Sequence, residues 1–123
     1  MRRRTWKYKV KQLGRLSAHE FEGMAVAPAI TKDETAAMVA YHIRIPPRTR
    51  IPHSYHKKAH EIIVVLDGRG TAHLDRSRVA LRKGRVLLVQ PRTWHSFSTA
   101  ASPLEFIAVA APRVDAKTDL YYT

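Results

Sequence analysis

The chain has 123 residues, 45% of them hydrophobic, which suits one globular domain with a single core. It contains no cysteine, which excludes disulfides, zinc–thiolate sites and thiol catalysis. The formal net charge of +12 favours anionic partners, and no apolar run approaches the roughly 20 residues that span a bilayer.

Residues 1–15 form a basic arm with seven Lys and Arg side chains and no acid. Lysines interrupt the segment after Met1–Arg4, so the apolar part of a signal peptide is missing, and we expect a cytoplasmic protein. Trp6, Tyr8 and Val10 alternate with lysines, which predicts an edge strand in this subunit or a second one. We favour a solvated arm that aids solubility, and contact with nucleic acid is the alternative.

Short apolar segments separated by turn residues predict an all-β protein. Ser17 begins a short helical turn that reaches Glu22, and residues 21–30 form a loop or a short strand. A strand at 36–45 ends at Pro46–Pro47. The later predicted strands are 62–66, 70–75, 79–81, 85–89, 95–99 and 104–110. About eight short strands are typical of a β-sandwich or a barrel.

The densest group of metal-binding side chain types lies directly before an apolar run. His53, His56, His60 and Glu61 fall within nine residues, and imidazole and carboxylate are common ligands of divalent transition metals. The run Ile62–Leu66 is too short for a helix and predicts a buried strand. Asp67–Gly68 then predicts a tight turn, with residues 70–75 as the returning strand of a hairpin.

A second stretch supplies one more histidine after a proline turn. Residues 85–89 predict a strand, Pro91 a turn, and His95 the start of the next strand. Because the start of a strand holds a side chain rigidly, His95 is placed to complete a site begun by His56 and Glu61.

The spacing of these residues resembles the two motifs of the cupin superfamily. His56, four residues, Glu61, six residues and Gly68 resemble the second half of the first motif. Gly84, six residues, Pro91, three residues and His95 resemble the second motif. The resemblance extends over residues 36–110 and implies a small jelly-roll barrel, the double-stranded β-helix.

The resemblance also implies a metal site in the barrel. The family's second histidine, its glutamate and its last histidine correspond to His56, Glu61 and His95. Ser54 stands where the family has its first histidine. We predict His53 as the fourth ligand, which requires a bulge because regular alternation sets His53 opposite His56. The expected cofactor is one divalent ion of Fe, Mn, Ni, Zn or Cu.

Three further residues are candidates for the pocket. Tyr55 lies between ligands, and Arg44 shares a strand face with His42, from which it could reach a carboxylate or phosphate. Arg92 replaces the family's glycine in the turn before His95. His42 and His73 lie on strand faces, where a satisfied structural role is more common than ligation.

These observations favour a metal-binding cupin that acts on, or binds, a small polar and anionic molecule. The resemblance allows dioxygenase-like, isomerase-like or lyase-like chemistry. The alternative is a non-catalytic ligand-binding or sugar-binding module whose basic arm contacts a partner or nucleic acid. We expect one domain over 1–123, with its arm at 1–15, its core at 36–110 and its tail at 111–123. We also expect a homodimer, because Trp6, Tyr8 and the tail tyrosines offer apolar surface.

Overall fold

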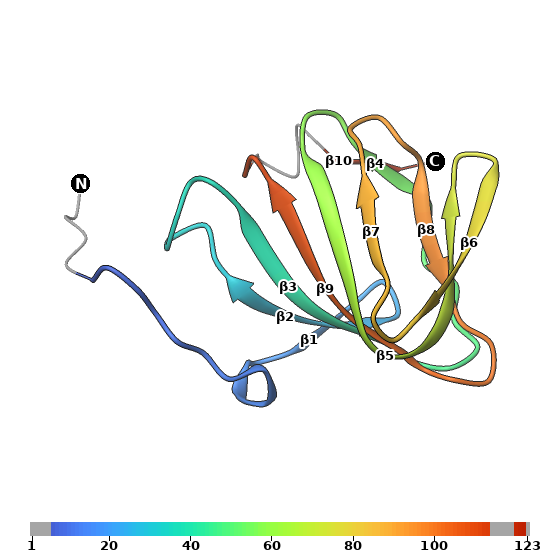
Figure 1. The fold of residues 1–123 in the computed structure, drawn as a ribbon, viewed down its shortest axis with the longest axis horizontal. Helices are drawn as coiled ribbons and strands as arrows, with labels where there is room; N and C mark the ends of the chain where they lie inside the picture. The colour runs from blue at the N-terminus through green and yellow to red at the C-terminus, as the bar shows by residue number, and fades with distance from the viewer. Residues whose placement is uncertain (1–5, 114–119, 123) are drawn as a thin grey trace.

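The structure, a computed structural model, describes residues 6–113 and 120–122 (Figure 1). Apart from a short 3-10 turn, η1 (Leu13–Arg15), its regular elements are all β-strands. The strands are β1 (His19–Phe21), β2 (Met24–Ile30), β3 (Val39–Ile45), β4 (Ser54–His56), β5 (His60–Leu74), β6 (Ser77–Arg82), β7 (Val86–Val89), β8 (His95–Ser98), β9 (Leu104–Ala111) and β10 (Leu120–Tyr122). The all-β prediction is therefore confirmed. No helix in this part of the chain has the length and hydropathy to cross a membrane.

The strands form one curled antiparallel sheet with two walls. Its hydrogen-bonded order is β1-β2-β3-β9-β5-β8-β4-β10, and β6 and β7 also pair with β5. Figure 1 shows β5 running beside β9 in one wall and curling at its lower end towards β6 and β8 in the other. The sheet curls as the double-stranded β-helix does. Its first strands, β1 and β2, precede residues 36–110, which were expected to form the core.

The predicted hairpin turn at Asp67–Gly68 is wrong. Residues His60–Leu74 form one continuous strand, and its register with β9 shifts between Val65 and Asp67. Gly68 has φ +82°, so the Asp-Gly pair does supply the left-handed backbone that a turn requires. That conformation bends the strand from one wall into the other instead of reversing it.

The N-terminal segment also differs from the prediction. The expected helical turn is absent, and His19–Phe21 forms strand β1 against β2. Glu22 and Gly23 both have positive φ, 53° and 88°, which is the two-residue hairpin turn that matches strand twist. Within 6–12 no strand forms, so the arm does not add an edge strand to its own sheet there, and pairing with a second subunit stays a prediction. The first five residues of the arm lie outside the described residues.

Two lysines of the arm are held by one carboxylate of the domain. Lys9 Nζ lies 3.1 Å from Glu34 Oε2, and Lys11 Nζ lies 2.5 Å from Glu34 Oε1. Lys11 also donates to the carbonyl of Ala29 at 2.6 Å. The arm is therefore attached to the connection between β2 and β3 by charge-assisted hydrogen bonds.

The apolar core fills the end of the curl where β3 finishes and β9 begins. Ile45 and Leu104 are directly opposed there and fully buried, and Ile63 and Phe106 pack beside them. Each such side chain contributes about 1.5–3 kcal/mol to stability. The packing leaves the opposite end of the curl open as a cavity.

Candidate metal centre

A cavity of about 880 Å³ lies between the two walls. Its sides are mainly apolar and come from β2, β3, β8 and β9. The apolar lining includes Met24, Val26, Tyr41, Ile43, Phe97, Phe106 and Ala108. Charged and polar side chains also line it, among them His19, Glu22, Lys32, Asp33 and Arg113. The cavity can therefore hold a small molecule with an apolar body and polar ends.

Three polar side chains from three strands meet in this cavity. Glu61 is the second residue of β5 and shares its inner face with Ile63, which is fully buried, whereas Ile62 is exposed. The alternation of a strand directs the carboxylate inward. His56 ends β4 and His95 begins β8, two strands that pair through Ser54 and His95.

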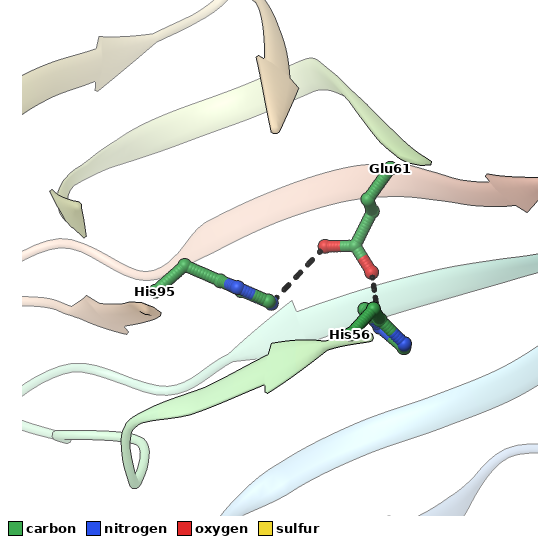
Figure 2. Close-up of side chains that lie close together, drawn as sticks. All are labelled: His56, Glu61 and His95. Carbon is green, nitrogen blue, oxygen red and sulfur yellow. Dashed lines mark ion pairs between the residues drawn. The ribbon is translucent and has the colours of Figure 1, made fainter. Parts of the chain in front are cut away.

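The carboxylate lies between the two imidazoles. His56 Nε2 is 3.3 Å from Glu61 Oε2, and His95 Nε2 is 3.6 Å from Glu61 Oε1 (Figure 2). The two rings stack with centroids 5.8 Å apart and planes 20° apart. One ligand atom from each of the three residues lies within 4.8 Å of the others. Their side chains are only 7–18% exposed.

His95 is oriented by the backbone of its own turn. Its Nδ1 lies 3.0 Å from the carbonyl oxygen of Thr93, which can only accept, so Nδ1 donates and Nε2 of the neutral ring keeps its lone pair. Metal-binding histidines commonly use their second nitrogen in this way. Two imidazoles and one carboxylate, without a thiolate, fit a divalent transition metal with positions left for other ligands. The residues present therefore fit the expected ion.

The structure does not bring His53 into this group. The backbone follows regular alternation, so Ser54 lies opposite His95 and lines the cavity. His53 lies near His73 instead, with ring centroids 6.4 Å apart. The bulge required for ligation by His53 is absent, and among the described residues the group has three members. His60 is exposed, as the alternation predicts.

His73 has a structural partner outside the cavity. Its Nε2 lies 2.7 Å from Ser98 Oγ. Burial first, and then the positive charges of Arg50, His53 and Arg78, lower the pKa of His73. The neutral ring is therefore favoured, in keeping with a hydrogen-bonded residue on the outer face of the sheet.

The three pocket candidates also lie elsewhere. Arg44 is exposed on the face of β3 that carries His42, opposite to the face that lines the cavity. Tyr55 packs edge-on against Trp94, with ring centroids 4.6 Å apart. Arg92 is exposed in its turn with φ 65°, and its amide donates to the carbonyl of His56 at 2.7 Å. None of the three lines the cavity.

Several cavity residues were missing from the sequence-based set of candidates, and Tyr41 and Arg113 are two of them. Tyr41 and Arg44 lie on opposite faces of β3, and the sequence analysis chose the face of Arg44 for the cavity. The same period of two, with the other face chosen, would have placed Tyr41 inside. Arg113 follows β9 in a polar segment without periodicity, where the sequence carries no signal of direction.

His42 pairs with Glu105 on the outer face of the first wall. Its Nε2 lies 2.5 Å from Glu105 Oε2, and the two residues come from the paired strands β3 and β9. The interpretation of His42 as a structural residue agrees with this contact.

Comparison with solved structures identifies several with the same fold. A variant of Pac13 from Streptomyces, solved with uridine, has a TM-score of 0.78 and 14% identity, covering 97% of this chain and 92% of that chain. The polyketide cyclase RemF from Streptomyces resistomycificus has 0.78 and 18%, covering 87% and 81%. A predicted oxalate decarboxylase from Thermotoga maritima has 0.77 and 20%, covering 84% and 98%. At these identities the likeness shows the fold.

A search among curated proteins finds no match to the sequence. The family model described as the cupin domain matches residues 41–110, more than half of the chain. That match spans β3 to β9 and includes His56, Glu61 and His95. The chain therefore belongs to the cupin domain family.

Proposed function

We propose that this cupin binds one divalent transition metal ion through His56, Glu61 and His95 and holds a small polar molecule beside it. The observation that carries the proposal is the convergence of three ligand atoms within 4.8 Å inside the cavity. Such a metal acts as a Lewis acid or a redox centre towards a bound molecule. The resemblance to the family allows dioxygenase-like, isomerase-like or lyase-like chemistry at such an ion.

The surroundings of the site support a role in binding a substrate. The apolar walls limit water around the three polar side chains, which strengthens electrostatic interactions with a ligand. If Glu61 binds the ion through one carboxylate oxygen, the other oxygen remains as a hydrogen-bond acceptor towards a bound molecule. One of the similar structures was solved with uridine, and another is named a polyketide cyclase. A small molecule of the size of uridine suits a cavity of about 880 Å³.

Elemental mass spectrometry of protein purified without an affinity tag tests the proposal. We expect about one transition metal ion per chain, and its loss in His56→Ala and in His95→Ala. His60→Ala is the matched control, because His60 is an exposed histidine of the same strand as Glu61. Circular dichroism of each variant shows whether the fold is kept.

Full retention of metal in folded His56→Ala and His95→Ala would rule out this site. Absence of metal even after reconstitution would favour the alternative, a non-catalytic ligand-binding module. In that alternative the basic arm contacts a partner or nucleic acid. The pairing of Lys9 and Lys11 with Glu34 weighs against nucleic acid, because the shared carboxylate offsets part of their charge within the chain. Deleting residues 1–15 and measuring salt-dependent binding to single-stranded DNA checks this.

A further inference from the structure

Arg113 is one of the cationic residues that line the cavity. The residue follows β9, lines the cavity together with Pro112, and is only partly exposed. Its Nε atom is buried and has no hydrogen-bond partner in the described part of the chain. Buried polar atoms are almost always paired, so an unpaired nitrogen in a ligand cavity needs a reason.

The acidic side chains of the cavity do not supply a partner for Arg113. Glu22 and Asp33 line the same cavity, yet no ion pair joins either one to Arg113 in the described residues. Glu61 lies between His56 and His95. The charge of Arg113 therefore has no acidic partner among the described residues, and its guanidinium can act towards a ligand from the wall of the cavity.

The register of the strands sets the position of Arg113. Ala110 of β9 lies directly opposite Glu61 of β5, and both line the cavity. Arg113 follows three residues later, so it enters the cavity from the end at which Glu61 stands. A guanidinium offers two parallel N–H donors in one plane, which matches the two oxygens of a carboxylate or phosphate.

We propose that Arg113 binds the anionic group, a carboxylate or a phosphate, of the molecule that occupies the cavity. The metal of the proposed function would then contact a different part of that molecule, and to this extent the inference rests on that function. The ligand class is a small organic acid or phosphate ester with an apolar body that packs between Tyr41, Phe97 and Phe106.

Pairs of probes that differ in charge but little in shape test the proposal. We would measure the binding of benzoate, benzamide and phenyl phosphate by ligand-observed NMR, with the protein as purified and after metal removal by chelation. The variants are Arg113→Ala and Arg113→Lys, and Arg92→Ala removes an exposed arginine as the control. Metal content is measured on every sample.

We expect the anions to bind about 10- to 100-fold more tightly than benzamide, as a charge-assisted hydrogen bond predicts. Arg113→Ala should abolish that preference, Arg113→Lys should keep part of it, and Arg92→Ala should leave it unchanged. A preference for benzoate or for phenyl phosphate distinguishes a carboxylate ligand from a phosphate ligand.

Equal binding of benzoate, phenyl phosphate and benzamide would overturn the proposal, and so would an anion preference that survives in Arg113→Ala. Failure of the metal proposal has a different result, namely protein without metal that still prefers anions through Arg113. If the preference disappears on metal removal while Arg113 is intact, the metal and not Arg113 binds the anion.

Discussion

Ser54 and His95 face each other directly across strands β4 and β8. Both line the cavity, and the imidazole of His95 belongs to the candidate metal centre. The serine therefore occupies the position from which the family's first histidine would reach the metal. The candidate site has three members among the described residues because regular alternation turns His53 to the other face of the strand.

Ser54→His should restore a fourth ligand. We expect the dissociation constant of the metal to fall by about tenfold or more, because an added imidazole shares the ion with the three existing ligands. Competition with a chelator of known affinity measures it. His53→Ala is the matched control and should leave metal affinity unchanged. Loss of metal in His53→Ala would show that His53 is a ligand after all.

Gly68→Ala should destabilise the fold strongly. A Cβ atom at this position would lie 2.0 Å from the carbonyl oxygen of Pro103, and the backbone has φ +82°. Steric overlap with backbone adds to left-handed strain, so we expect a loss of about 2–4 kcal/mol in the free energy of unfolding. Urea denaturation measures this value.

Gly84→Ala separates the two contributions. Gly84 has a similar φ of +90°, but no atom lies within 4 Å of the position of its Cβ. Only the conformational cost remains there, about 1 kcal/mol. Equal losses for Gly68→Ala and Gly84→Ala would show that contact with Pro103 contributes nothing.

The attachment of the arm should weaken in acid. The hydrogen bond from Lys11, followed by those from the Thr31 amide and from Lys9, lowers the pKa of Glu34 from 4.5 to about 2. A lowered pKa means that the interaction is fully present above about pH 4.5 and is lost as the pH falls towards 2. Trp6 is a reporter, because Lys9 Nζ lies 4.7 Å from its ring.

Fluorescence of Trp6 in a Trp94→Phe background follows this release. We expect an acid transition between about pH 4.5 and pH 2, before or together with global unfolding. Glu34→Gln should lack that transition and should show faster tryptic cleavage after Lys9 and Lys11 at neutral pH. Unchanged cleavage in Glu34→Gln would mean that the arm is held by other contacts.

Arg69 and Arg82 form a directly opposed pair of like charges on β5 and β6, and both are exposed. Like charges in this arrangement repel, so Arg82→Glu should stabilise the protein by up to about 1 kcal/mol at low salt. Thermal unfolding measures the gain, which should shrink at about 1 M salt because of screening. Most of the gain should disappear in an Arg69→Ala background, and its full persistence would contradict a pairwise origin.

The sequence could predict that His56, Glu61 and His95 come together because the signal is local in each motif. The spacing of His56 and Glu61 and the position of His95 after a proline turn place all three at strand ends, and the pairing of the strands brings these ends together. Alternation along the strand puts Glu61 and Ile63 on one face. The choice between His53 and Ser54 depended on whether the backbone bulges, which side-chain chemistry does not determine.

Prediction from the sequence failed where one local pattern is compatible with two structures. Asp67–Gly68 offers the same left-handed backbone to a hairpin turn and to a bulge, and only the long-range pairing of β5 with β9 selects the bulge. The packing of the whole sheet decides whether the face of β3 that carries Arg44 turns towards the cavity or away from it. The pattern of a single strand does not contain that information. Arg113 takes its direction from the end of β9 and has no periodic pattern to indicate it.

The fifteen residues of β5 form hydrogen bonds with four other strands, β6, β7, β8 and β9. Because one backbone serves both walls, neither wall is complete until β5 has met partners that come later in the chain, the last of which is β9. Folding must therefore wait for contacts of long sequence separation, which makes it slow compared with that of helical proteins of this size. It also makes unfolding cooperative, because the loss of β5 removes the shared strand from both walls in one event.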